Sequence, residues 1–539
     1  MLLLHESPCS AKSLELAQGI FAERFTAIAP DTPGYGLSDP LPLPQPEIAD
    51  YADALAGLLD VLGIRQAAVY GRHTGASIAA EFAHRHPDRC AMLLTGGLPV
   101  YSTAQRESRL TEYLRPLVPS WDGAHLLWLW FRYRDQHVFW PWHDQRGERR
   151  AAVDVPDLAS LQRGVTEFLE AGDGYRVAYA AAFRHGGAAL AMVPDLRVPA
   201  CFTARESDSL LRTLPLFPPG TWTASLPSDE AEASRMERNL LAMHPAADAA
   251  PPPLTSAALP GKVSVGYLDL AEGQVLLRSV NPAGVGTPVL VLHHAPGSTA
   301  CYEALLLALG QDRRALAFDL PGCGESLPPP GFVPDIAAWA STVLAVLDQL
   351  ELPQVQLYGH GGGAAVAVEL AYRAPDRVAS VTLDGPPALP SEGRDGFAAS
   401  YAPSARPDWD GSHLIRVWHH LRDQELWWPW YTRTQAAARP GEPDLDPASL
   451  TLRARECLKQ PASYQPAWKA VLSYPLLERL PELRVPVRVL AAEGDLFAHL
   501  APEAAAAAGV APHTVAADWA TRAAASLALL PAIAKGTAA

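Results

Sequence analysis

The 539-residue chain has few cysteines and no long apolar run. Its 6 cysteines are scattered, with no Cys-x-x-Cys pair and no spacing typical of zinc ligands. We therefore expect no disulfide framework, no metal site, no cofactor and a reducing, cytoplasmic setting. No stretch approaches about 18 continuous apolar residues, so the sequence predicts no membrane-spanning helix. The apolar start, Met1–Leu4, is too short for a secretory signal.

The chain also lacks an excess of basic residues. It has 43 Lys and Arg against 58 Asp and Glu, a formal net charge of -15 at pH 7. A nucleic acid or an anionic membrane would need a basic face, so we expect neither as a partner. A composition with 49% hydrophobic and 19% charged residues is typical of a soluble globular enzyme with a small-molecule substrate. The sequence does not indicate an oligomeric state.

What the sequence does contain is an internal repeat, which indicates two copies of one unit. The matching segments are Leu2–His5 and Leu290–His293, Asp31–Gly36 and Asp319–Gly324, Gly71 and Gly359, and Trp121–His125 and Trp409–His413. Each pair is separated by 288 positions (293 − 5, 319 − 31, 359 − 71 and 409 − 121). Unrelated segments would not keep this register, so we interpret the chain as a tandem duplication. A Pro- and Ala-rich run predicts units at 1–244 and 261–539 with a linker at 245–260.

Both units alternate short apolar strands with alanine-rich helices. This alternation predicts an α/β fold with a buried, mostly parallel sheet in each unit. In the second unit the expected strands are 289–293, 315–319, 355–358, 378–384 and 485–492, and the expected helices are 336–350 and 364–373. About a hundred tryptophan-rich residues precede the last of these strands, a length that predicts an inserted helical cap.

The first unit has no match to the start of the second. Segments 263–268 and 274–279 predict a leading β-hairpin in the second unit, but the position 288 residues before 263 precedes Met1. Either the first unit lacks its first two strands, or the start codon is misplaced, or the second unit supplies that edge. The sequence leaves these three alternatives open.

Three shared motifs resemble those of the α/β-hydrolase family. They are His-x-x-Pro after a strand (5–8 and 293–296), Asp-x-Pro-Gly-x-Gly-x-Ser (31–38 and 319–326), and Gly-x-x-x-Gly between a strand and a helix (71–75 and 359–363). They occur in family-like order and spacing, twice, over essentially the whole chain. The resemblance implies two hydrolase-like units, each with its reactive position at the elbow where the strand turns into the helix.

Both elbows nevertheless lack the family's nucleophile. The central residue of the Gly-x-Ser-x-Gly elbow is exposed on a sharp turn, but here it is His73 in one unit and Gly361 in the other. The family's histidine base is also missing from the stretch between the last strand and the last helix of either unit. Only the carboxylate that the family places after its seventh strand has counterparts, Asp208 and Asp495. Ordinary serine acyl transfer is therefore not predicted in either unit.

For the first unit we hypothesise acid–base chemistry by His73, oriented by Asp208. The helix N-terminus disfavours the imidazolium and Asp208 favours it, an opposition that would hold the pKa of His73 near neutrality. Backbone amides after His5 would stabilise an oxyanion, as the resemblance implies. The residues expected at the oxyanion site or in the pocket are His5, Glu6, Ser7, Arg72, Thr74, His125, Trp128 and Trp140. The alternative is that catalysis has been lost and His73 is tolerated at a degenerate turn.

The second unit is expected to be inactive, because Gly361 offers no side chain. It could act only through neighbouring residues, and its candidate site residues are His293, His294, His360, Gly361, His413 and Asp495. The segment 359–364 with Asp384, 20 residues later (384 − 364), also fits a dinucleotide-binding fingerprint. The first unit has His73 in place of the middle glycine, so we do not favour nucleotide binding.

The predicted caps share more residues than the elbows do. Segments 121–142 and 409–430 have in common Trp-Asp-Gly-x-His-Leu, a further Trp, Arg-Asp-Gln and Trp-Pro-Trp. Indole rings can line an apolar pocket, and His125 and His413 could contact a substrate there. The same residues could instead form the core of the cap, and their presence in the unit expected to be inactive favours this structural role.

Two functions follow from these observations. The first is an enzyme, hydrolase or lyase-like, that acts on a small apolar substrate through His73 and Asp208 rather than a serine triad. The second is a non-catalytic protein that uses two hydrolase-shaped pockets for binding or assembly. Turnover that is lost in His73→Ala would indicate the enzyme.

Overall fold

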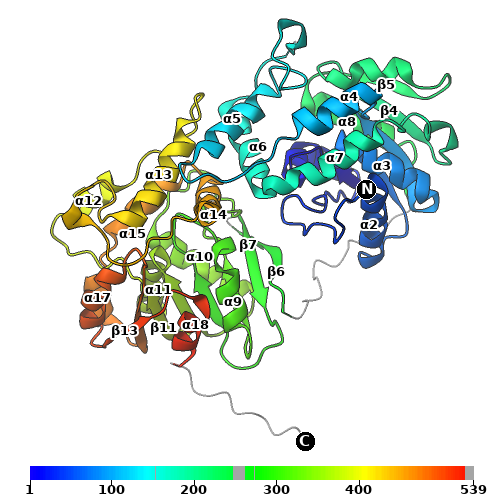
Figure 1. Cartoon of the computed structure of the whole chain (residues 1–539). Coiled ribbons are helices and arrows are strands. Elements are labelled where there is room, and N and C mark those ends of the chain that lie inside the picture. Colours follow the sequence, from blue (N-terminus) through cyan, green and yellow to red (C-terminus); the bar gives the residue numbers. More distant parts are fainter. Residues whose placement is uncertain (152, 247–260, 272, 529–539) are drawn as a thin grey trace, which may run out of the picture. The chain divides into compact units, whose positions relative to one another are not determined.

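The computed structural model describes residues 1–151, 153–246, 261–271 and 273–528. The chain divides into two compact units, Met1–Val118 with Trp128–Thr255 and Pro119–Leu127 with Ser256–Ala539. Residues 247–260, most of the predicted linker, lie outside the described residues. Each unit is built on a sheet of its own (Figure 1).

The first unit has a parallel sheet of five strands. In space they follow chain order: β1 (Leu2–Leu4), β2 (Ala67–Arg72), β3 (Cys90–Gly96), β4 (Ala200–Arg205) and β5 (Thr223–Leu226). Every pairing is parallel, and the central strands are almost wholly buried. Parallel strands end at one edge of a sheet, so the residues that follow β2 and β4 meet there.

Helices pack on this sheet through apolar faces. α1 (Glu15–Ala22) and α8 (Glu230–Leu241) contact each other and share one core with the strands, in which Phe21 and Leu241 meet Leu3 and Tyr70. α2 (Ile48–Val61) packs against α3 (Thr74–Arg85), which in turn contacts β1, β2 and β3. α3 follows β2 after a single residue, and this close connection forms the elbow.

The second unit has a mixed sheet of eight strands. Their spatial order is β13 (Pro512–Val515), β12 (Val487–Ala492), β11 (Val378–Asp384), β10 (Val355–His360), β8 (Val289–Leu292), β9 (Ala315–Phe318), β7 (Gly273–Val280) and β6 (Ser264–Leu270). β7 pairs antiparallel with β6 and with β9, and the other pairings are parallel. The predicted α/β fold class is confirmed, because each unit combines a wholly or mostly parallel sheet with flanking helices.

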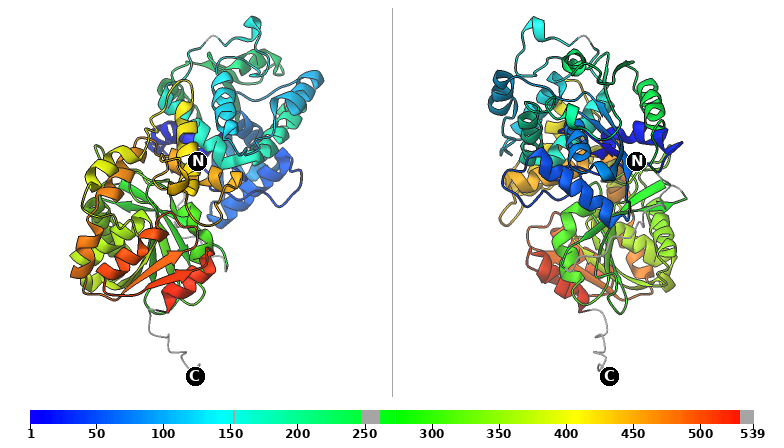
Figure 2. Two further views of the ribbon diagram at one scale, coloured as in Figure 1. Left: turned by 60° about the vertical axis from the view of Figure 1, so that its left-hand side comes forward. Right: turned by 90° about the vertical axis from the view of Figure 1, so that its right-hand side faces the viewer.

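Helices lie on both faces of this sheet (Figures 1 and 2), and an apolar core lies on each face. Alternate residues of β8 divide between them, Leu290 and Leu292 on one side and Val289 and Val291 on the other. α10 (Ile336–Gln349) and α11 (Gly362–Arg373) contribute to the first core. α9 (Glu303–Leu309) and α18 (Trp519–Leu527) pack together over the second. Short strands that are apolar on both faces therefore become the buried centre, as their composition predicts.

Aspartate side chains set the beginnings of many helices. An aspartate carboxylate accepts a hydrogen bond from a backbone N–H of the first turn, which would otherwise lack a partner. This cap occurs at Asp229 before α8, at Asp335 before α10 and at Asp518 before α18. The caps before α8 and α18 correspond to each other in the two units, in the stretch where the family's histidine is missing.

The two sheets differ at one edge. Among the described residues, the first sheet has no counterpart of β6 and β7, and the stretch corresponding to β9 forms one parallel bridge, between Leu2 and Ile28. β1 is consequently an edge strand, whereas its counterpart β8 lies inside its sheet. The hairpin β6–β7 joins the sheet of its own unit.

Helices are inserted between corresponding strands of the two sheets. Those between β3 and β4 are α4 (Thr103–Ser108), α5 (Ala124–Asp135), α6 (Leu158–Ala171) and α7 (Tyr175–His185). Those between β11 and β12 are α12 (Arg394–Tyr401), α13 (Ser412–Leu426), α14 (Pro447–Leu458), α15 (Tyr464–Ser473) and α16 (Leu476–Arg479). The insertions occupy the segments where a cap was expected. No helix in the described ranges is both long and apolar enough to cross a membrane.

Candidate functional site

The elbow of the first unit is a sharp turn between β2 and α3. β2 ends at Arg72, α3 begins at Thr74, and His73 between them has φ 49° and ψ −107°. The flanking glycines are required, because a Cβ at Gly71 would lie 2.1 Å from the carbonyl oxygen of Gly75. A Cβ at Gly75 would lie 2.2 Å from the carbonyl oxygen of Leu4. The predicted bend at 71–75 is therefore present, with an imidazole at its centre.

His73 and Asp208 lie within hydrogen-bond distance of each other. His73 Nε2 is 2.8 Å from Asp208 Oδ2, although 135 residues separate them in the chain. Asp208 follows β4, and its Oδ1 accepts a hydrogen bond from the backbone N–H of Leu210 (2.8 Å), which fixes the carboxylate. No hydrogen bond in the described part of the chain involves His73 Nδ1. With the Nε2 proton donated to Asp208, Nδ1 carries the lone pair and is the nitrogen free to accept a proton.

The environment of His73 favours its charged form. Burial lowers the pKa of His73, but the Asp208 carboxylate outweighs burial, so the pKa is raised above its ordinary value of 6.5. Burial likewise raises the pKa of Asp208, and His73 more than reverses this, so the net shift is downward. The sequence-based expectation set the helix N-terminus against Asp208, whereas in the structure it is burial that opposes Asp208, and the carboxylate prevails. The His73 side chain keeps 38% of its surface exposed, against 13% for Asp208.

A cavity of about 500 Å³ opens over this pair. Five of the expected pocket residues line it, namely Glu6, Ser7, Arg72, Thr74 and Trp140. Other lining side chains come from the inserted helices and the segments beside them, among them Tyr133, His137 and Tyr179. The volume and the aromatic lining suit a small, largely apolar molecule.

Two of the candidate histidines hold backbone instead of facing a cavity. His5 is buried, its Nε2 accepts a hydrogen bond from the N–H of Thr32 (2.9 Å), and its Nδ1 lies 2.9 Å from the carbonyl oxygen of Glu6. His293 repeats this arrangement, because its Nε2 accepts the N–H of Leu320 (2.9 Å) and its Nδ1 lies 2.7 Å from the carbonyl oxygen of His294. Neither ring lines the cavity of its unit. The expectation of a direct pocket role for His5 and His293 is corrected, because both ring nitrogens already join the loops around the sheet edge.

The remaining candidates from the shared cap motif also lie outside the cavities. His125 is buried and accepts a hydrogen bond at Nδ1 from the N–H of Ser120 (3.1 Å), which closes the turn before α5. His413 does the same with the N–H of Asp408 (3.1 Å) before α13. Trp128 is absent from the cavity lining and its ring packs against another tryptophan. The shared motif thus supports the structural reading of these residues and corrects the pocket role expected for them.

An ion-pair cluster that sequence analysis missed lies beside His73. Arg72 Nη2 donates to Glu230 Oε1 (2.8 Å), and Arg205 donates to both oxygens of the same carboxylate. Burial raises the pKa of Glu230, but the two guanidinium groups hold it at about 2. Glu230 is the first residue of α8, so this pair fills the region where the family has its histidine. No motif contains both partners, so only the structure could bring them together.

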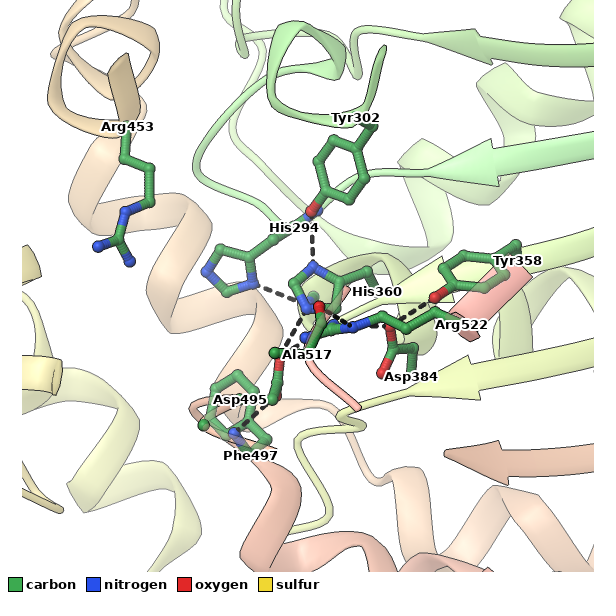
Figure 3. Close-up of polar contacts among 12 residues, drawn as sticks. His294, Tyr302, Tyr358, His360, Asp384, Arg453, Asp495, Phe497, Ala517 and Arg522 are labelled. Carbon is green, nitrogen blue, oxygen red and sulfur yellow. Dashed lines mark hydrogen bonds and ion pairs between the residues drawn. The ribbon is translucent and has the colours of Figure 1, made fainter. Parts of the chain in front are cut away.

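The second elbow has the same backbone with a different arrangement of side chains (Figure 3). β10 ends at His360, α11 begins at Gly362, and Gly361 has φ 52° and ψ −118°. A Cβ on Gly361 would lie 2.3 Å from Nδ1 of His294, whose ring reaches over the elbow from the loop after β8. Glycine is therefore required at this position, and an imidazole occupies the space above it.

The ring of His360 is engaged on both sides. Nε2 lies 2.6 Å from Asp495 Oδ2, and Nδ1 lies 2.7 Å from the hydroxyl of Tyr302 (Figure 3). The other oxygen of Asp495 accepts the N–H of Phe497 (3.0 Å). The structure thus brings His294, His360, Gly361 and Asp495 together, with Tyr302 as a partner that the sequence did not reveal. Unlike His73, His360 has no free ring nitrogen for a substrate.

The backbone N–H groups beside the second elbow are also engaged. The N–H of Gly362 donates to Nδ1 of His294 (3.0 Å), and the N–H of His294 donates to the hydroxyl of Tyr302 (2.8 Å). In the first unit the corresponding groups belong to Thr74 and Glu6, and no hydrogen bond in the described ranges uses either N–H. The family's oxyanion donors are thus open in one unit and closed in the other.

Asp384 belongs to the interior of the second unit. Its Oδ2 accepts hydrogen bonds from the hydroxyl of Tyr358 (2.5 Å) and from Arg522 (2.9 Å). A ribose-binding carboxylate must be reachable by a ligand, so this burial argues against the dinucleotide reading. Within the described residues, no group of three or more His, Cys, Asp or Glu side chains is placed to hold a metal ion.

Comparisons with known proteins match both regions that contain the elbows. A family model for the alpha/beta hydrolase fold matches residues 5–121 and, separately, residues 287–415. Proline iminopeptidase of Heyndrickxia coagulans is 34% identical over 127 residues, and 2-hydroxy-6-oxo-2,4-heptadienoate hydrolase of Pseudomonas putida is 32% identical over 145 residues. These matches cover 22% and 26% of this chain and 42% and 52% of the two relatives. The chain therefore spans about half the length of these relatives.

A solved structure is also similar to part of this chain. The enol-lactonase from Burkholderia xenovorans LB400 is 16% identical, with a TM-score of 0.35. The match covers 46% of this chain and 90% of that protein.

Proposed function

Two regions of this chain belong to the α/β-hydrolase family, and from that premise we propose that the first unit is an enzyme that works by acid–base chemistry at His73. Its substrate is a small, largely apolar carbonyl compound, and the reaction is hydrolytic or lyase-like. The observation that carries the proposal is the contact of 2.8 Å between His73 Nε2 and Asp208, which leaves Nδ1 free beside a cavity. The Pseudomonas relative, named as a hydrolase of a small unsaturated oxo acid, supports this class of substrate.

In the proposed reaction His73 takes up one proton. Nδ1 accepts a proton from a bound water or from an acidic carbon of the substrate, and the positive charge that forms on the ring is stabilised by Asp208. A positioned general base of this kind accelerates a reaction by about 10²- to 10⁴-fold. No covalent intermediate is needed, which agrees with the absence of serine, cysteine or aspartate at the elbow.

The developing negative charge on the substrate has two donors available. The backbone N–H groups of Thr74 and Glu6 belong to residues that line the cavity, and neither is used by a hydrogen bond in the described ranges. Donors fixed in advance beside the reacting group stabilise an oxyanion more strongly than water does. Base and oxyanion donors therefore occur together in the first unit.

The test is turnover by the purified full chain. Short esters, lactones and β-dicarbonyl compounds would be screened, and His73→Ala should lower kcat/KM by about 10²- to 10⁴-fold. Asp208→Asn should lower it as well, because the base loses its orientation. His360→Ala is the matched control from the second unit, and it should keep the activity.

A non-catalytic role in binding or assembly is the competing function. If no substrate is turned over, this role replaces the enzyme, and activity that survives both His73→Ala and Asp208→Ala would overturn the role proposed for these two residues. Activity that is lost in His360→Ala and kept in His73→Ala would transfer the chemistry to the second unit.

A further inference from the structure

The second unit has a cavity of about 510 Å³ for which the proposed reaction has no use. We propose that this cavity is a binding site for an uncharged carbonyl compound, whose oxygen accepts a hydrogen bond from Nε2–H of His294. The site binds its ligand without converting it. This assignment is independent of the proposed reaction, because it concerns a different unit and different residues.

The hydrogen bonds around His294 decide where its proton lies. Nδ1 accepts the backbone N–H of Gly362 (3.0 Å), so Nδ1 must carry the lone pair and Nε2 the proton. Burial and the neighbouring His360 lower the pKa of His294 to about 3, so the ring stays neutral at ordinary pH. No hydrogen bond among the described residues uses Nε2, and the ring lines the cavity. The second unit thus presents one side-chain donor at its elbow.

The charges around the cavity select an uncharged ligand. Glu442, Asp444 and Glu493 add carboxylates to the lining. The two arginines of the lining are already paired, Arg453 with Glu425 (2.5 Å) and Arg522 with Asp384 (2.9 Å). Figure 3 shows Arg453 beyond His294, on the side away from His360. An anionic ligand would meet net negative charge here, whereas a neutral carbonyl oxygen needs only the single donor.

The remaining lining favours an aromatic or aliphatic body on the ligand. Tyr302, Phe497 and Trp519 supply ring faces, and Leu421, Leu452 and Leu496 supply aliphatic surface. Such a lining with a small number of polar groups is typical of small-molecule sites. An aryl ketone combines the two features that the cavity selects.

Binding without turnover follows from the elbow. Gly361 offers no nucleophile, both ring nitrogens of His360 are engaged, and the two backbone donors are closed by Tyr302 and His294. A substrate held by His294 would meet no free base and no backbone oxyanion site.

Acetophenone is a suitable probe, with benzoate as an anion of similar shape and ethylbenzene as a hydrocarbon without an acceptor. In the full chain labelled with ¹⁵N-histidine, the side-chain signal of His294 is assigned by its loss in His294→Phe. Acetophenone should shift the Nε2–H signal of His294, and benzoate and ethylbenzene at the same concentration should leave it in place. No shift with acetophenone, or an equal shift with benzoate, would overturn the proposal.

Affinity gives a second measurement. One neutral hydrogen bond corresponds to about a fivefold to tenfold change in affinity, so His294→Phe should weaken acetophenone binding by that factor. The phenyl ring keeps the volume and removes the Nε2 donor together with the Nδ1 acceptor, so it also releases the N–H of Gly362. His73→Phe is the matched control in the first unit, and it should not change the shift at His294. Unchanged acetophenone affinity in a folded His294→Phe chain would contradict the assignment.

Discussion

At the scale of single residues, the elbows show two ways of placing an imidazole at a position where the family has a nucleophile. His73 is part of the elbow and bonds to Asp208, whereas His294 reaches the second elbow from a neighbouring loop and bonds to backbone. The first arrangement leaves a ring nitrogen with a lone pair on a histidine that lines a cavity, and the second leaves a ring N–H on a histidine that lines the other cavity. A histidine side chain is thus placed as a base in the first unit and as a hydrogen-bond donor in the second.

The raised pKa of His73 predicts how activity depends on pH. Only the neutral ring can accept a proton, and Asp208 stabilises the charged ring, so kcat/KM should rise with pH through an apparent pKa above 6.5. Asp208→Asn should move this pKa downward, because the stabilising charge is removed while burial remains. The pH profiles of the two proteins check this. A rising limb with a midpoint below 6.5 in the unaltered protein would contradict it.

The raised pKa of His73 also makes the free energy of unfolding depend on pH, and this free energy falls over the pH range in which activity rises. A histidine whose folded pKa is raised contributes stability that is fully present below its ordinary pKa and is lost as the pH rises through the folded value. For His73 the window therefore begins near 6.5 and extends upward. The pH range in which the base becomes active is the range in which its ion pair with Asp208 stops stabilising the fold.

Gly361 predicts a large effect for a small substitution. In Gly361→Ala the new Cβ would displace His294 from the N–H of Gly362, in addition to the strain of a φ of 52°. Gly393 is the matched control, because its φ is 73° and no heavy atom lies within 4 Å of a Cβ there. Gly393→Ala should lose about 1–2 kcal/mol from strain in the left-handed region. Gly361→Ala should lose about 1 kcal/mol more from the broken hydrogen bond, in addition to the strain of its own φ of 52° and ψ of −118°. Denaturant unfolding measures both, and equal losses would show that His294 adapts freely.

At the scale of elements, a buried glutamate joins an inserted helix to the loop after the first parallel strand in both units. Glu167 on α6 accepts hydrogen bonds from the N–H (2.7 Å) and hydroxyl (3.0 Å) of Ser10. Glu456 on α14 accepts one from the hydroxyl of Ser298 (2.6 Å). Their charge environments differ, because Arg455 lies 2.6 Å from Glu456. Burial raises the pKa of Glu167 to about 7, whereas Lys459 and Arg455 overcome burial and lower that of Glu456 to about 2.

These shifts predict opposite pH dependences for the two glutamates. The contribution of Glu167 is fully present below 4.5 and is lost as the pH rises to about 7, because the folded state keeps the proton longer. That of Glu456 is present above 4.5 and is lost as the pH falls towards 2. In the unaltered protein Glu167 should lower the free energy of unfolding by about 1–3 kcal/mol as the pH rises from 5 to 8. Glu167→Gln should abolish this decrease. Glu456→Gln should lower the free energy of unfolding by the same amount at pH 5 and at pH 8, so the pH dependence in this interval should not change. Urea unfolding at the two pH values measures both effects, and a change of the opposite sign in either variant would contradict the prediction.

The elements themselves were largely predictable, and the exceptions have a physical cause. The strands from β8 to β12 are short apolar runs buried on both faces, so composition and length suffice to find them. The stretch corresponding to β9 in the first unit could not be predicted, because a strand also needs a neighbour. Without a hairpin beside it, that stretch forms only the bridge between Leu2 and Ile28.

At the scale of the whole molecule, the candidate sites were predictable only where a motif fixes the position of a residue. His73 follows from its place in the elbow and Asp208 from its place after a strand, and parallel strands bring their ends to one edge. Tyr302, Arg205 and the partner of Arg72 belong to no motif. These residues come together only at the ends of several strands, and no spacing in the sequence predicts that contact. His5 and His125 bond to backbone, because a recurrent histidine can serve backbone geometry alone.

The hydrogen bond between Gly362 and His294 has a consequence for inhibitors. A compound that mimics an oxyanion and competes for elbow amides finds the N–H groups of Thr74 and Glu6 vacant, and those of Gly362 and His294 already taken by the protein itself. The imidazole of His294 is part of the chain and occupies the N–H of Gly362 permanently, so dialysis cannot remove it. Titration with such a mimic should therefore saturate at one equivalent per chain, and the mimic could inhibit the first unit alone without any discrimination by pocket shape.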